Sequence, residues 1–210
     1  MERVVPSVTY DKSLNDSGIS YQVMINQQKI GRFLQKTGMP QDEFVNTEIV
    51  VKKGSRSELA SIERFEGRYR INVVTDDVWK IYEEAMEQAM KLSYGISNKE
   101  ADFGDMLYTK RLGNYLKKAP ATRGLQFASK LLLNAVNREL NSNFLHEVKH
   151  LVDQVAGKYR LWFRFGRIVD FLPLIERIDP TEKSAAEFES YYKNHPEMRD
   201  LITIQPKRKI

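Results

Sequence analysis

The stretch Leu-His-Glu-Val-Lys-His-Leu, residues 145–151, contains two histidines four positions apart, with a glutamate directly after the first. On an α-helix, side chains four positions apart lie on one face, so the two imidazoles project together. That spacing allows His146 and His150 to bind one zinc ion. Glu147 lies about a quarter-turn round from His146, where it can take a proton from a water bound to the metal. The chain has only three histidines, so this pattern is specific.

The residues around the two histidines fit a helix that is buried on one side. Phe144, Val148, Leu151 and Val155 form an apolar stripe beside the histidine face. Asp153 follows His146 by seven positions and lies on the same side, where it either holds a histidine N–H or faces solvent. The competing interpretation of the whole pattern is a pair of partly buried core histidines without a metal.

Zinc at a catalytic site takes a third protein ligand and leaves its fourth position to water. Cysteine is absent, so this ligand must be His, Asp or Glu. The third histidine, His195, lies far downstream. Three glutamates are candidates for the ligand: Glu176, Glu182 and Glu187.

The last expected helix, over residues 179–194, separates these candidates. Its apolar stripe is Ala185, Phe188 and Tyr192, and Glu182 precedes Ala185 by three positions, so Glu182 should point inward. Glu187 falls on the water-facing side, and the direction of Glu176 is not determined. Asp-Pro-Thr-Glu at 179–182 also reads as a capping box, in which Glu182 would only cap its helix.

The part of the chain before residue 75 is expected to be rich in β-strands. Four runs favour strands of a small antiparallel sheet, at 19–24, 29–34, 44–52 and 69–74. Residues 26–28 are interpreted as a turn, and 57–65 as a further strand or a short helix. We therefore expect a β-rich N-terminal part over residues 1–74.

Residues 75–210 are expected to be mainly helical and to bind the metal. A helix is predicted over 76–92, then an irregular region over 93–120 with a short strand at 106–109. The helical pattern over 122–156 should break at Asn-Ser-Asn, residues 141–143, and close at Gly157. The fold class is therefore α+β, with a single domain over residues 1–210.

Composition limits the environment and the partners. The 210 residues are 41% hydrophobic, and no apolar stretch is long enough to span a bilayer or to act as an N-terminal signal. We expect a soluble, cytoplasmic protein with no membrane partner. The net charge is +5, with acidic and basic residues interspersed, so nucleic acid is not the expected partner. The sequence gives no oligomeric state.

The two motifs together resemble a known group of enzymes. His146-Glu-x-x-His150, followed by Glu182-x-x-Ala-Ala-x-Phe, is similar to the gluzincin pattern, and the size of the chain is similar to that of minigluzincins. The resemblance covers roughly residues 70–195. One departure is Ala186, where the family commonly has Asp or Asn.

The resemblance implies a zincin-like fold, with a small N-terminal sheet, a backing helix, an active-site helix and a C-terminal ligand helix. It implies a zinc metallopeptidase in which Glu147 activates water and His146, His150 and Glu182 hold the zinc. A protein or peptide substrate would pair in extended form with an edge strand. An oxyanion donor is also expected, and its candidates are Tyr191, Tyr192, His195 and Arg160.

Two other functions stay open at this stage. A zinc-binding latent or regulatory protein would have its cleft blocked by its own tail. The apolar segment 201–204 is the candidate plug, and the alternative interpretation of this segment is a strand. A binding module is suggested by residues 159–167, which interleave arginines with aromatic rings as single-stranded nucleic acid requires. The favoured interpretation of that segment places its rings in the core and its arginines in water.

Overall fold

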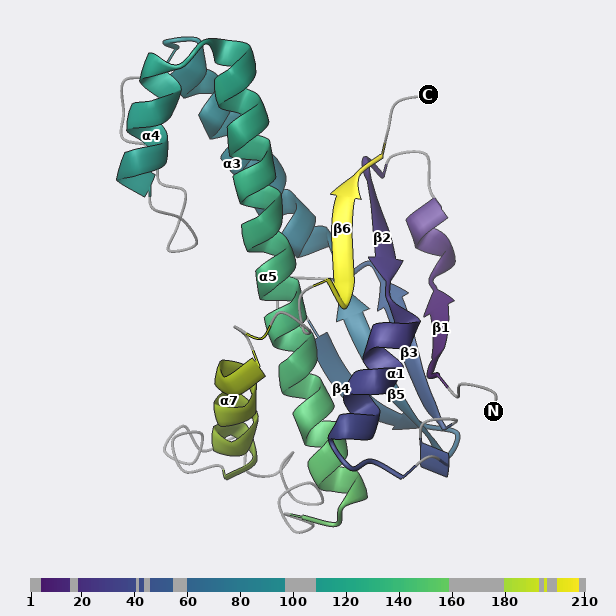
Figure 1. Ribbon diagram of the computed structural model, residues 1–210. Helices are drawn as coiled ribbons and strands as arrows, with labels where there is room; N and C mark the ends of the chain where they lie inside the picture. The colour runs from purple at the N-terminus through teal and green to yellow at the C-terminus, as the bar shows by residue number, and fades with distance from the viewer. Residues whose placement is uncertain are drawn as a thin grey trace, which may run out of the picture.

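The computed structural model describes residues 5–15, 19–40, 42–43, 46–54, 60–96, 109–158, 180–192, 195 and 200–207. These residues form an α+β fold in which two small sheets lie beside one long helix (Figure 1). Within the described ranges, no helix combines the length and the apolar character needed to cross a membrane. The predicted fold class is confirmed at this level.

The larger sheet is mixed rather than antiparallel. Its order is β1 (Ser7–Tyr10), β3 (Thr47–Lys52), β5 (Arg68–Val74), β4 (Ala60–Phe65). The first three strands are parallel, and only β4 runs antiparallel to β5. The prediction of an antiparallel sheet was wrong for the two parallel pairings, because strand direction depends on connections that local patterns do not encode. The segment predicted as strand or helix over 57–65 is a strand from Ala60 onward.

Helix α1 (Gln27–Lys36) occupies the segment that was predicted to be a turn and a strand. Asn26 caps this helix, since its side chain accepts a hydrogen bond of 3.0 Å from the backbone N–H of Lys29. Ile30, Phe33 and Leu34 are fully buried at helical spacing. The strand prediction was therefore wrong, because a short apolar run fits either period and the cap decides between them.

The C-terminal segment returns to the N-terminal part of the chain. Strand β6 (Ile202–Pro206) pairs antiparallel with β2 (Tyr21–Ile25), and Ile204 lies opposite Val23. Leu201, Ile202 and Ile204 are buried in the common core. The β-rich and helical parts are therefore joined by β6 and share one core.

Two further helices precede the long one. Helix α3 (Asp76–Ser93) begins and ends as predicted. Helix α4 (Thr109–Lys118) lies where an irregular region was expected, so that prediction was wrong for this stretch, and residues 97–108 are outside the described part. Leu112 and Leu116 of α4 are buried in the core, which stabilises this short helix by tertiary contact.

Helix α5 (Ala121–Val155) is continuous over 35 residues, and the predicted break at 141–143 is wrong. The polar side chains there make contacts instead of interrupting the helix. The amide of Asn141 binds both the N–H (3.0 Å) and the C=O (2.7 Å) of Ile202, and Asn137 binds Ile204 in the same way. Gly157 has a φ of 67° and closes the helix as predicted.

Candidate metal centre

The three predicted ligands meet between α5 and α7 (Pro180–Tyr192). Nε2 of His146 lies 3.0 Å from Oε2 of Glu182, and Nε2 of His150 lies 3.2 Å from Oε1 of the same carboxylate. The candidate ligand atoms of the three side chains all lie within 4.8 Å of one another. The imidazole centroids are 4.8 Å apart. The structure therefore groups His146, His150 and Glu182, as the sequence predicted.

Packing of α7 against α5 and α1 determines this meeting. Ala185 is fully buried, and the ring of Phe188 lies 5.8 Å from that of Phe33 in α1. On α5, Phe144 and Val148 are fully buried as predicted. The apolar stripe of α7 thus turns inward, and Glu182, one turn before Ala185, comes to lie against the histidines.

The chemistry of these three side chains fits a zinc ion. Two imidazoles and one carboxylate form a donor set typical of catalytic zinc, with metal–ligand distances of about 2.0–2.2 Å. In a tetrahedral arrangement such bonds put the donor atoms roughly 3.3 Å apart. The N–O distances of 3.0 and 3.2 Å in the group are close to that separation. The widest separation in the group is up to 4.8 Å, so the three side chains could hold a divalent cation once the ligand atoms draw closer together.

Electrostatics couples the two imidazoles to the carboxylate. Hydrogen bonds from His146 and then His150 hold the pKa of Glu182 well below its ordinary value, against the opposing effect of burial. The hydrogen bond to Glu182 raises the pKa of His146, while burial opposes the rise and Glu147 and Glu189 add to it. Both oxygens of Glu182 face imidazoles, so this residue does more than cap its helix.

Glu189 is a member of the site that the sequence prediction missed. Its Oε2 lies 3.5 Å from Nδ1 of His146, and its Oε1 accepts a hydrogen bond from the hydroxyl of Ser142, which is buried. The resemblance placed a supporting Asp or Asn at 186, where this chain has Ala186. The available signal was spacing, since positions 182, 186 and 189 share one face of a helix.

Asp153 is buried rather than solvent-facing, so that alternative is wrong, and the contacts described for its carboxylate are with Ser184 and lysines rather than with a histidine. Only 1% of its surface is exposed. It accepts a hydrogen bond of 3.1 Å from the hydroxyl of Ser184 on α7 and pairs with Lys149 on its own helix. Asp153 of α5 therefore contacts α7 at Ser184, two positions after Glu182.

The other predicted residues are distributed as follows. Glu147 is half-buried on α5, and Glu187 faces water as expected. His195 lies beside the exposed ring of Tyr191, with ring centroids 4.8 Å apart, and its Nδ1 is 2.8 Å from the Tyr191 carbonyl oxygen. Tyr192 packs edge-on against Phe33. Their role as oxyanion donors stays a prediction.

Three of the predictions fall on parts of the chain outside the described residues. They concern Glu176, Arg160 and the aromatic segment 159–167.

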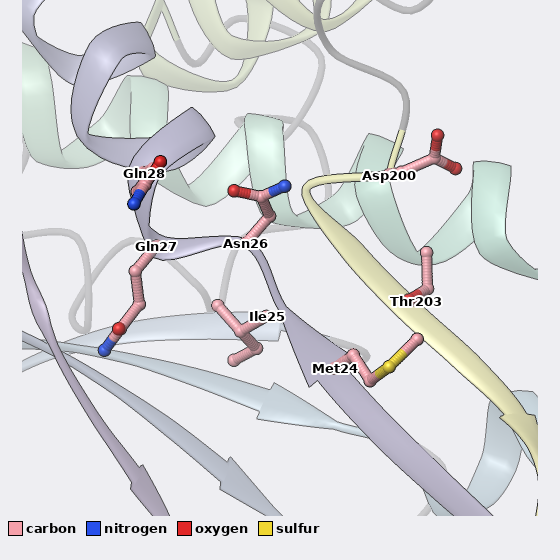
Figure 2. A pocket seen from close by; sticks show the side chains of 7 residues that line it. All are labelled: Met24, Ile25, Asn26, Gln27, Gln28, Asp200 and Thr203. Atoms are coloured by element: carbon pink, nitrogen blue, oxygen red, sulfur yellow. The ribbon is translucent and has the colours of Figure 1, made fainter.

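A surface hollow elsewhere in the molecule contains none of the predicted site residues. It lies where β2 leads into α1, and Figure 2 shows the lining residues Met24 and Thr203 on the neighbouring strands β2 and β6. Its lining consists of Met24, Ile25, Asn26, Gln27, Gln28, Asp200 and Thr203. We therefore base the candidate site on the His-His-Glu group rather than on this hollow.

Comparison with family models, with curated proteins and with solved structures gives no match to this chain.

Proposed function

We propose that this chain is a zinc-dependent metallopeptidase with a zincin-like arrangement of its active-site and ligand helices. The observation that carries the proposal is the grouping of His146, His150 and Glu182. The two histidines come from α5, and Glu182 comes from α7, 36 residues after His146. The position of Glu147, directly after the first histidine, supports hydrolysis in addition to metal binding.

Bound by these three side chains, zinc would supply Lewis acidity, which lowers the pKa of water and polarises a carbonyl group. Glu147 is the proposed general base: its carboxylate accepts the proton from the attacking water and then donates it to the leaving amine. Glu147 is half-buried, and the side chain of Glu182 is 53% exposed, so the group is open to solvent on one side. A substrate can approach from that side.

The proposed substrate is a protein or peptide in extended conformation. Strand β4 forms one edge of the mixed sheet, is antiparallel to β5 and contacts α5. Among the described strands, β4 pairs only with β5, so its outer edge has backbone groups available for another strand. Addition of a peptide strand at such an edge is a common mode of recognition.

The structure gives the candidate plug a different role. The segment 201–204 leads into and forms β6, and Leu201, Ile202 and Ile204 are buried in the core. Removing this segment would remove core contacts, so truncation does not test self-inhibition. The burial of this segment in the core supports an open metallopeptidase over a latent protein with a blocking tail, which stays an alternative proposal. The absence of cysteine fits the reducing cytoplasm, which is the proposed location.

Hydrolysis of unfolded casein by zinc-loaded protein tests the proposed function. Wild type should cleave casein, a chelator should stop cleavage, and Glu147→Gln should lower the rate by about 10²–10⁴-fold. Glu187→Gln, on the exposed side of α7, is the matched control and should retain the wild-type rate. Undiminished cleavage by Glu147→Gln, or no cleavage of casein by zinc-loaded wild type, would contradict the proposal.

A further inference from the structure

One stretch of the chain departs from the even mixture of charges. Residues 106–138 contain no Asp or Glu, although an even spread of the 28 acidic residues over 210 positions would place about four there. The same stretch contains seven of the 33 basic residues, so it carries +7 while the rest of the chain carries −2. The net positive charge therefore comes entirely from this acid-free stretch.

The described part of this stretch forms α4 and the first half of α5. Figure 1 shows α4 and the adjoining part of α5 at the end of the molecule away from the sheets. Gly124 of α5 lies close to Leu116 and Ala119 at the end of α4, and to Ser93 at the end of α3. The three helix ends are therefore packed together.

Four basic side chains are exposed on the outside of this helical end. Lys117 and Lys118 come from α4, and Arg123 and Lys130 from α5. Within the described part of the chain, none of the four forms an ion pair with a carboxylate. The lysines of α3 differ, since Lys80 pairs with Glu84 and Lys91 with Glu87. The positive charge of α4 and α5 is thus presented to solvent.

Two aromatic rings lie among these charges. Tyr115 is 43% exposed and Phe127 is 47% exposed, and their ring centroids are 4.9 Å apart. Arg123, Phe127 and Lys130 are spaced by four and three positions, so they share one face of α5. The ring pair joins this face to the exposed face of α4. Lys118 follows Tyr115 by three positions and lies on the same side of α4. We name the resulting surface the basic-aromatic face: Tyr115, Lys118, Arg123, Phe127 and Lys130.

We propose that the basic-aromatic face binds single-stranded nucleic acid. Its basic side chains would neutralise backbone phosphates, and its exposed rings would stack on unpaired bases. A lipid surface fits less well, because the apolar residues of α4, Leu112 and Leu116, are turned into the core. The proposal reverses the sequence-based expectation about nucleic acid, and it is independent of the metal centre.

Fluorescence anisotropy of a labelled single-stranded oligothymidylate of roughly 20 nucleotides, longer than the site of one small binding module, tests the proposal. Wild type should bind it, more weakly at about 200 mM salt than at about 50 mM. The triple variant Lys118→Gln, Arg123→Gln, Lys130→Gln should bind at least about tenfold more weakly, with its salt slope reduced by roughly two. The matched control, Lys12→Gln, Lys80→Gln, Lys207→Gln, loses the same charge elsewhere and should bind as wild type does.

Stacking is tested with Tyr115→Ala, Phe127→Ala, which keeps all charges and should weaken binding by at least about tenfold. The triple variant of the basic residues and the double variant of the aromatic residues should both retain the far-ultraviolet circular dichroism of wild type, because the changed residues are exposed. If the control triple variant binds the oligonucleotide as weakly as the triple variant of the face, the loss of affinity depends on net charge alone and the proposal is wrong. Failure of wild type to bind the oligonucleotide while it sediments with phosphatidylserine vesicles would also overturn it, in favour of a membrane.

Discussion

Nδ1 of His146 lies 3.5 Å from Oε2 of Glu189, on the opposite side of the imidazole ring from the nitrogen that faces Glu182. A carboxylate in this position fixes the orientation of the ring and leaves the other nitrogen to a metal. Ser142 in turn donates a hydrogen bond to Glu189, so the orientation of the histidine depends on contacts between α5 and α7.

Glu189→Gln should therefore weaken zinc binding by about 10–100-fold without abolishing it. Ser142→Ala should have a smaller effect in the same direction, because it removes only the support of the carboxylate. Competition with a chromogenic chelator measures both affinities. Glu187→Gln, on the same helix, is the control. A Glu189→Gln variant that binds zinc as tightly as Glu187→Gln would rule out the positioning role.

Asn141 gives a stability test in which two physical effects have opposite signs. Local helix propensity favours alanine over asparagine, so Asn141→Ala would be stabilising if the helix stood alone. The change also removes both partners of the buried Ile202 backbone, which should cost about 2–4 kcal/mol. Urea denaturation should therefore show a clear loss in the free energy of unfolding.

Asn143→Ala provides the comparison for that experiment. The amide of Asn143 binds Glu139 within the same helix, so its removal should change the free energy of unfolding by less than about 1 kcal/mol. If the two alanine variants are equally stable, the contact between α5 and β6 does not contribute as described.

The buried carboxylate of Asp153 should contribute to the docking of α7. Asp153→Asn removes the charge that pairs with Lys149 and weakens the bond to Ser184, and should cost about 2 kcal/mol in unfolding free energy. Lys158 lies 3.9 Å from the same carboxylate but is 63% exposed, so Lys158→Ala should cost less than about 0.5 kcal/mol. A neutral effect of Asp153→Asn would show that packing alone positions α7.

The mixed sheet should become less stable in acid through Glu48. Hydrogen bonds from Thr9 and then Arg70 lower the pKa of Glu48, while burial opposes the change. A lowered pKa in the folded state gives stability that is present above the ordinary carboxyl pKa and is lost as the pH falls through the folded-state value. Melting temperatures of wild type and Glu48→Gln should therefore differ at neutral pH and converge as the pH falls below the ordinary carboxyl pKa. A difference that stays constant with pH would contradict this linkage.

The local parts of the site were predictable from sequence because helical spacing places each side chain on a face of its own helix. His146, Glu147 and His150 lie within one helical turn, and Glu182 lies one turn before a buried alanine. Glu189 shares a face of α7 with Glu182, but spacing alone does not show that Ser142 and His146 lie against it.

The errors in the fold have the same origin. Local propensity suggested a break at Asn141, but a strand 61 residues away satisfies its side chain. The apolar run in α1 fitted the periodicity of both a helix and a strand. The N-terminal cap made by the side chain of Asn26 favours the helix. Parallel pairing in the larger sheet likewise depends on the path of the chain, which residue patterns do not specify.

Metal analysis after dialysis against trace zinc tests whether His146, His150 and Glu182 share one zinc ion. Wild type and Glu187→Ala should each retain about one zinc per chain, whereas His150→Ala and Glu182→Ala should retain almost none. Glu147→Gln should retain the metal because Glu147 is not a ligand. Wild type without zinc, or Glu182→Ala with as much zinc as wild type, would contradict the account.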